Sequence, residues 1–307
     1  MADTFVFNNA ITWAHYRIKG GRRILLLPTV GYGALIVGLI IASLRLEPQD
    51  SEGILSGWMI GLLALQSGAL LLYGGSTVRN AVRKDMTSGM IGSHRLMPIS
   101  GTEAIAGYIM GAVPQPLAIF VTNLLIGILV SGPARLSPLD WIVGNGLLLL
   151  FAACVWVVVA CLSFLAPKSA GALMFLVILL AVPGSMVLLA VPALTVLCTP
   201  VIGPTVYGII MKGTANLSTY HVPMMCQICV TIMFFIAAVR KFRRDDVLAA
   251  GPLFGLLIVG AFLAVSAYGI NNWSRLAPGP LGMASRGMLP VQVLSSMIVA
   301  ALLGLIP

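Results

Sequence analysis

Residues 140 to 165 read DWIVGNGLLLLFAACVWVVVACLSFL, an apolar run in which Asp140 is the single charged residue. A membrane-spanning helix needs about 20 predominantly apolar residues, so this run predicts a transmembrane helix. The same hydropathy pattern, followed outward in windows of about 19 residues, predicts seven further spans. These lie at residues 24–44, 54–73, 104–131, 170–198, 219–239, 248–270 and 291–306.

The composition of the whole chain favours a membrane protein. Of its 307 residues, 59% are hydrophobic and 9% are charged, and the mean hydropathy is +1.02. Ordinary soluble domains carry about 25% charged residues, so a soluble fold is excluded. The net charge of +9 does not indicate nucleic-acid binding, because the chain has little polar surface outside its loops to form a basic stripe. We therefore expect an all-α integral membrane protein, a polytopic helix bundle.

The distribution of Lys and Arg predicts the orientation of this bundle. Of the 18 basic residues, 13 fall on the side that carries the N-terminus and 5 on the other. Basic residues accumulate in cytoplasmic loops, so we expect a multi-pass protein of the cell (cytoplasmic) membrane with its N-terminus in the cytoplasm.

Residues 1–23 precede the first span and predict an amphipathic helix on the cytoplasmic interface. Asp3 or Thr4 would cap its start, and the basic run 17–23 suits membrane lipid with anionic head groups. A disordered basic tail is the alternative. The expected apolar face consists of four residues at helical spacing: Phe7, Ile11, Ala14 and Ile18.

We expect six spans to form a core over residues 24–240, followed by about two additional spans over 241–307. The apolar segment 199–218 is too short for a full crossing and predicts a re-entrant element. Two spans are longer than a bilayer requires and contain prolines, so kinks or breaks are expected there. These prolines are Pro114 and Pro116 in one span, and Pro183 and Pro192 in the other. The chain ends inside the last predicted span, which suggests either a truncated chain or a short final helix.

The most polar stretch is residues 74–103, GGSTVRNAVRKDMTSGMIGSHRLMPISGTE, which we place in the cytoplasm between the second and third spans. Ser100 and Glu103 have the spacing of a capping box, in which each side chain bonds the backbone amide of the other residue. Pro98 disfavours helical geometry at the residue before it. The pattern predicts a helix over 77–96, interrupted near Gly89 or Gly92, then a turn and the third span.

This stretch resembles the cytoplasmic segment of type-2 ABC exporter permeases. The resemblance rests on Asp85-Met86-Thr87-Ser88-Gly89, then Leu96-Met97-Pro98-Ile99-Ser100, then Glu103 and Gly107. In that family an acid and a Gly begin a short amphipathic helix, a Leu-x-Pro-[Ile/Val/Leu]-Ser turn follows, and a Glu and a Gly open the third span. The chain departs from the family in having Arg83-Lys84-Asp85 where a Glu-Arg-Glu type cluster is usual, and in continuing past six spans.

The resemblance implies the permease subunit of an ATP-driven ABC exporter, with a separate ABC ATPase subunit and a second permease copy or homologue as partners. A coupling helix within residues 84–97 would dock on the ATPase. Its apolar contacts would be Met90, Ile91 and Leu96, surrounded by Arg83, Lys84, His94 and Arg95. The full expected set of ATPase-coupling residues is Asp85, Gly89, Met90, Ile91, Arg95, Leu96, Pro98, Ser100 and Glu103. A solvated basic loop is the alternative for the charges.

The sequence contains no phosphate-binding G-x-x-x-x-G-K-[ST] motif and no H-E-x-x-H motif, and its three histidines are far apart in sequence and predicted topology. We therefore expect no catalytic, metal or cofactor site and no enzyme activity. Every acid is expected in a loop or at a membrane boundary, which disfavours a transporter coupled to protons or sodium. A membrane scaffold or assembly protein is the second hypothesis, and a membrane-embedded enzyme is the third.

Uncharged polar residues within the spans either bond neighbouring helices or line a path for an amphiphilic substrate. The expected substrate-path residues are Gln66, Gln115, Asn123 and Asn145. Gly107 and Gly111 have the small-residue spacing of a close helix contact.

Overall fold

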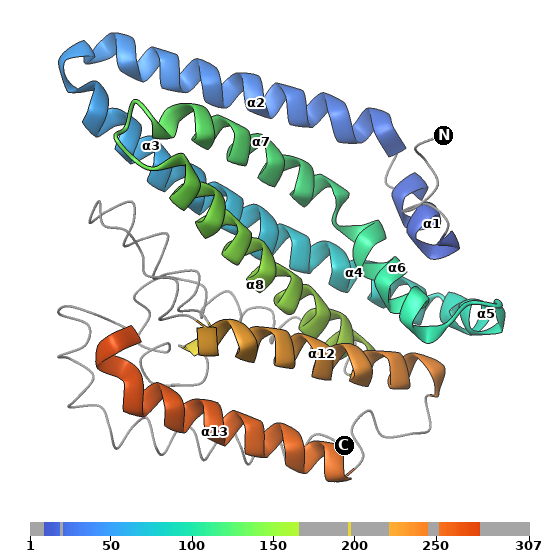
Figure 1. Cartoon of the computed structure of the whole chain (residues 1–307). Coiled ribbons are helices and arrows are strands. Elements are labelled where there is room, and N and C mark those ends of the chain that lie inside the picture. Colours follow the sequence, from blue (N-terminus) through green and yellow to red (C-terminus); the bar gives the residue numbers. More distant parts are fainter. Residues whose placement is uncertain (1–8, 19–20, 166–195, 198–220, 245–251, 277–307) are drawn as a thin grey trace.

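The computed structural model describes residues 9–18, 21–165, 196–197, 221–244 and 252–276 (Figure 1). The described residues form helices and no strand, so the predicted all-α class is confirmed for this part of the chain. The helices are α1 (Ala10–Ile18), α2 (Gly21–Leu46), η1 (Pro48–Asp50), α3 (Ser51–Ser67), η2 (Gly68–Gly74), α4 (Gly75–Thr87), α5 (Met90–Leu96), α6 (Gly101–Ala112), α7 (Pro114–Ser131), α8 (Pro138–Leu165), α12 (His221–Arg243) and α13 (Pro252–Leu276).

Five helical segments within the described residues are long and apolar enough to cross a membrane, as expected for a membrane protein. They are Ile24–Leu46, Pro48–Thr87, Pro114–Ser131, Pro138–Leu165 and His221–Arg243. Residues 252–270 of the predicted span 248–270 lie in helix α13, and residues 248–251 lie outside the described residues. The predicted spans 170–198 and 291–306 and the predicted re-entrant segment 199–218 lie outside the described residues, apart from residues 196–197.

The predicted third span is broken into two helices. α6 ends at Ala112 and α7 begins at Pro114, with Val113 between them at φ −101° and ψ 8°. Proline has no amide hydrogen to continue the helix and disfavours helical geometry at the residue before it. The expected break at Pro114 is therefore confirmed.

The helical path that contains the predicted second span, 54–73, continues beyond the apolar residues of that span. One helical path runs through α3, the π-helical segment η2 and α4, from Ser51 to Thr87. The π-helix was not predicted. α3 is capped by the Asp50 side chain, which accepts a hydrogen bond from the Gly53 amide at 3.2 Å.

Helix α1 begins later than predicted and contacts the bundle through a different face. Asn9 caps it, because its Oδ1 accepts hydrogen bonds from the amides of Ile11 at 3.0 Å and Thr12 at 3.4 Å. The alternative caps, Asp3 and Thr4, and the expected face residue Phe7 lie outside the described residues. The buried side chains are Ile11, Thr12 and His15. Ile18 is 64% exposed and Ala14 is half-buried, so neither is buried against the bundle, and their place on a side that faces the membrane stays a prediction.

The reason for this difference is the surface that α1 meets on α6. A Cβ atom on Gly107 would lie 3.0 Å from Ile11 Cβ, and one on Gly111 would lie 2.8 Å from His15 Cβ. The predicted close contact at these two glycines is thus confirmed. α1 therefore buries Ile11, Thr12 and His15, which pack closely on these two glycines, although Thr12 and His15 are polar.

Two apolar clusters hold the described helices together. The small cluster joins α2, α3, α7 and α8 and contains Ile36, Ile40, Leu55, Met59, Leu62, Ile126, Val130, Ala134 and Trp141. The large cluster joins η2, α4, α6, α7, α8 and α12 and includes Leu70, Val78, Tyr108, Phe120, Leu148, Trp156, Phe164 and Phe242. The helices α1, α5 and α6 gather at one end of the bundle, beside the end of α12 (Figure 1).

Candidate functional site

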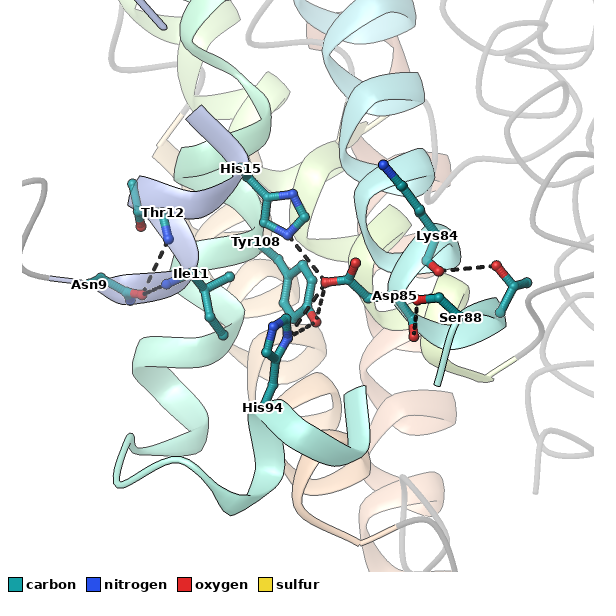
Figure 2. A network of polar contacts seen from close by, with 10 residues as sticks. Asn9, Ile11, Thr12, His15, Lys84, Asp85, Ser88, His94 and Tyr108 are labelled. Atoms are coloured by element: carbon teal, nitrogen blue, oxygen red, sulfur yellow. Dashed lines mark hydrogen bonds and ion pairs between the residues drawn. The ribbon is translucent and has the colours of Figure 1, made fainter. Parts of the chain in front are cut away.

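Four polar side chains from four helices meet at the end of the bundle where α1, α5 and α6 gather (Figure 2). Asp85 comes from α4, His15 from α1, His94 from α5 and Tyr108 from α6. Their exposed fractions are 4%, 7%, 7% and 0%, respectively. We call these four residues the Asp85 cluster.

One oxygen of Asp85 is the centre of the cluster. Tyr108 Oη donates a hydrogen bond to Asp85 Oδ2 at 2.9 Å, and His94 Nδ1 lies 2.9 Å from the same hydroxyl oxygen. The hydroxyl has one hydrogen, which points to Asp85, so the contact with His94 requires the imidazole tautomer that carries a hydrogen on Nδ1. His15 Nε2 and His94 Nδ1 lie 3.4 Å and 3.5 Å from Asp85 Oδ2. A single buried carboxylate is therefore surrounded by donors from three other helices.

The turn between α4 and α5 places His94 beside Asp85. α4 ends at Thr87, and Gly89 adopts φ +74°, a left-handed geometry that glycine reaches without steric cost. The chain then reverses into α5, whose buried side carries Ile91 and His94. The predicted interruption at Gly89 is confirmed.

The turn between α5 and α6 contains the predicted capping box. The Glu103 amide donates to Ser100 Oγ at 3.1 Å, and the Ser100 amide donates to Glu103 Oε2 at 2.7 Å. Hydrogen bonds from the Ser100 backbone and then from its side chain hold the pKa of the Glu103 carboxyl below its ordinary value. The capping box therefore fixes the start of α6, about two turns before Tyr108.

An aromatic group extends the cluster to α8 and α12. The Tyr108 ring lies 5.8 Å from the Phe164 ring and 6.4 Å from the Phe242 ring, centroid to centroid. Arg95 of α5 donates from Nε to the Phe242 carbonyl oxygen at 2.6 Å. A cation near the last carbonyls of a helix also interacts favourably with the helix dipole. α5 is thus tied to α12 as well as to α4 and α6.

The structure separates the expected coupling residues into two groups. Met90 and Leu96 are 47% and 88% exposed, and Pro98 is also exposed. Ile91 is buried in the large cluster, so its expected role as an outward apolar contact was wrong. His94 and Arg95 also do not surround an exposed patch, because they bond Tyr108 and the end of α12.

The Asp85 cluster was not predicted from the sequence. The histidines were expected far apart, whereas the fold brings His15 and His94 to one carboxylate. Asp85 was expected on a helix of the cytoplasmic loop, and the structure shows that this helical residue is buried. The available signal was the Gly107/Gly111 spacing, because a helix that packs there brings His15 close to the turn after Asp85.

The arrangement joins helices and does not resemble a metal centre. Within the residues that the structure describes, no group of three or more His, Cys, Asp or Glu side chains is arranged to hold a metal ion. Through these contacts a displacement of α5 would reach the helices to which it is bonded.

The expected substrate-path residues do not all lie together. Gln115 Oε1 accepts a hydrogen bond from Tyr73 Oη at 2.7 Å, on the partly exposed surface between η2 and α7. Gln66, Asn123 and Asn145 are fully buried in the helix bundle, each with 0% exposure.

No protein-family model, curated protein or solved structure matches the chain. The resemblance to ABC permeases therefore rests on the sequence motif around Asp85 and Pro98 and on the topology predicted from the sequence.

Proposed function

We propose that the chain is the permease subunit of an ATP-driven ABC exporter, and that a separate ATPase subunit docks at α5. The observation that supports this most is the two-sided character of α5. One side of this short helix presents exposed apolar side chains, and the other side is bonded to three helices of the bundle, α4, α6 and α12.

The outward side of α5 fits a docking partner. Leu96, Met90 and Met97 are 88%, 47% and 40% exposed, on the most polar stretch of the chain. Arg83 and Lys84 are exposed at the end of α4, and a partner with acidic residues around an apolar cleft would complement them. An ATPase subunit is the occupant that the sequence motif implies.

The inward side of α5 suits transmission of movement. His94 connects α5 to α6 and α4 through Tyr108 and Asp85, and Arg95 connects it to α12. α4 continues through η2 into α3, which lies in the membrane-spanning part of the same helical path. Closure of an ATPase on α5 would therefore displace helices that cross the membrane.

A site-specific crosslinking experiment tests this proposal. A photo-crosslinking amino acid is placed at Ser93, which is exposed on α5, in the full chain in its native membrane. The matched control carries it at Leu46, which is 82% exposed and is the last residue of α2, a helix that ends at the other end of the bundle (Figure 1). Mass spectrometry of the Ser93 adduct should identify a protein with a G-x-x-x-x-G-K-[ST] motif. Absence of any such ATPase from the Ser93 adducts overturns the proposal.

A scaffold that binds partners through the same loop is distinguished by coupling. Substitution of Leu96 with Asp should abolish the stimulation of ATP hydrolysis that the permease causes in a reconstituted complex. A scaffold predicts no such stimulation in the unsubstituted chain.

A further inference from the structure

Three buried amide side chains occupy equivalent places on three neighbouring helices. Gln66 of α3, Asn123 of α7 and Asn145 of α8 each have 0% exposure. On the helical path that carries each amide, one neighbour belongs to the small cluster and another to the large cluster. For Gln66 these neighbours are Leu62 and Leu70, for Asn123 they are Ile126 and Phe120, and for Asn145 they are Trp141 and Leu148.

Contacts between the helices link the turns that carry these amides. The Trp141 indole donates to the Leu124 carbonyl oxygen at 3.2 Å, next to Asn123, and Asn145 Nδ2 donates to the Trp141 carbonyl oxygen at 2.7 Å. Leu63 of α3 and Leu124 of α7 pack against both clusters, so the boundary between the clusters runs past them. We call Gln66, Asn123 and Asn145 the amide layer.

The amide layer contains hydrogen-bonding atoms that have no partner. These atoms are Gln66 Nε2, Gln66 Oε1, Asn123 Nδ2 and Asn145 Oδ1. More than about 90% of buried polar groups in proteins are hydrogen-bonded, so four such atoms in one layer require an explanation. They offer donors and acceptors together, and none of the three side chains carries a charge.

A second feature marks the same place. Gln66 lies two residues before η2, the π-helical segment that begins at Gly68, and π-helical turns occur frequently at functional sites. The π-helix leaves the Leu70 carbonyl oxygen to accept a hydrogen bond from the Trp156 indole at 2.8 Å.

Helix α2 covers the layer on one side. Tyr32 of α2 donates a hydrogen bond to Asn123 Oδ1 at 2.9 Å. Much of α2 is exposed, including Leu27, Val30 and Leu35 at 75%, 68% and 60%, as expected for a helix that faces lipid. A molecule in the lipid would reach the amide layer by displacing the Tyr32 hydroxyl from Asn123.

We propose that the amide layer binds the uncharged, hydrogen-bonding head group of an amphiphilic molecule, a hydroxyl or a carboxamide, which enters from the lipid past Tyr32. A hydroxyl or carboxamide both donates and accepts, which matches the unpartnered atoms of Gln66. The apolar clusters on both sides suit an alkyl chain and disfavour a charged head group. The inference rests on the proposed function, because the ligand would be the cargo of the exporter.

Fluorescence quenching by brominated alkyl probes tests the site. The full chain in lipid nanodiscs is titrated with 11-bromo-1-undecanol and, separately, with 1-bromoundecane, and quenching of tryptophan is followed, since Trp141 adjoins the layer. The alcohol should quench saturably, with an apparent affinity about tenfold tighter than that of the alkane, as expected for one net hydrogen bond. Gln66→Leu should remove this preference.

Two further variants make the test specific. Gln115→Leu removes an amide that lies outside the layer and bonds Tyr73, so it should keep the preference for the alcohol. Tyr32→Phe removes the covering hydroxyl and should tighten binding of the alcohol several-fold. Equal quenching by alcohol and alkane in the unsubstituted chain, or an unchanged preference in Gln66→Leu, overturns the inference.

The assay contains no ATPase and no ATP, so the two proposals fail separately. If the chain prefers the alcohol but no ATPase is captured at Ser93, the binding site is supported and the exporter function is contradicted. If an ATPase is captured but the chain does not prefer the alcohol, the exporter function is supported and the binding site is contradicted.

Discussion

Arg95 on α5 donates a hydrogen bond at 2.6 Å to the carbonyl oxygen of Phe242, near the end of α12 and 147 residues away in the sequence. Its guanidinium also lies 6.0 Å from the centroid of the Phe242 ring. One side chain thus joins the short helix after Gly89 to a predicted membrane span, and it does so through both a backbone and an aromatic contact.

Substitution of Arg95 tests this connection. Arg95→Ala should lower the free energy of unfolding by about 1.5–3 kcal/mol, because hydrogen bonds to charged groups are worth that much. Arg83→Ala, which removes an exposed arginine of α4, is the matched control and should have little effect. The measurement is thermal unfolding of the purified full chain. Equal effects of the two substitutions would contradict the assigned role of Arg95.

The Asp85 cluster should behave as one unit. Tyr108→Phe removes the hydroxyl that donates to Asp85 and accepts from His94, and should cost about 1–2 kcal/mol. Combined with Asp85→Asn, the double variant should be less destabilised than the sum of the single variants, by about 1 kcal/mol. Thermal unfolding of the three variants checks this, and strictly additive effects would argue that the two side chains act independently.

Gly111 should tolerate no side chain while α1 remains in place. A Cβ atom there would lie 2.8 Å from His15 Cβ and 3.1 Å from the Thr12 carbonyl oxygen. Gly111→Ala should therefore destabilise the chain by about 1–3 kcal/mol or detach α1. Gly146→Ala on α8 is the control, because a Cβ atom there meets nothing within 4 Å. A spin label at Ile18, which is exposed, reports detachment as increased mobility, and unchanged mobility and stability would contradict the packing of α1 on α6.

Gln66→Leu should stabilise the chain when no ligand is present. The substitution removes two buried atoms without partners, Nε2 and Oε1, and an unsatisfied buried polar group costs about 1–3 kcal/mol. Gln115→Leu should not stabilise it, because this residue loses the hydrogen bond from Tyr73. A lower unfolding temperature for Gln66→Leu than for the unsubstituted chain would show that the Gln66 amide has partners after all.

The capping box should make α6 sensitive to acid. The pKa of Glu103 is lowered in the folded chain, so its contribution to stability is present above the ordinary value of 4.5 and is lost as the pH falls through the lower folded value. Hydrogen exchange at the first amides of α6 should therefore accelerate below about pH 4.5, after correction for intrinsic exchange. Glu103→Gln, which keeps the side-chain shape without titrating, should lose this dependence. The same acceleration in both chains would assign it to another group.

Local patterns predicted the local structure well. The sequence predicts the interruption at Gly89, the capping box of Ser100 and Glu103 and the break before Pro114, and all three are present. Each depends on a few adjacent residues, because a left-handed glycine, a reciprocal cap and a missing amide hydrogen act within one turn of the chain.

The amino-acid sequence by itself determined that the chain is helical and apolar enough for a membrane, because lipid leaves helices as the way to satisfy every backbone polar group of such a segment. The tertiary structure decided which polar residues meet. His15 and Asp85 lie 70 positions apart in the chain, yet they lie 3.4 Å apart in space, because α1 packs on the glycines of α6 and α4 passes beside it. It also decided that Ile91 faces inward while Leu96 faces outward, since the bonds of His94 and Arg95 set the rotation of α5. Helical periodicity alone does not predict which side of such a short helix faces the bundle. The contacts with neighbouring helices determine it.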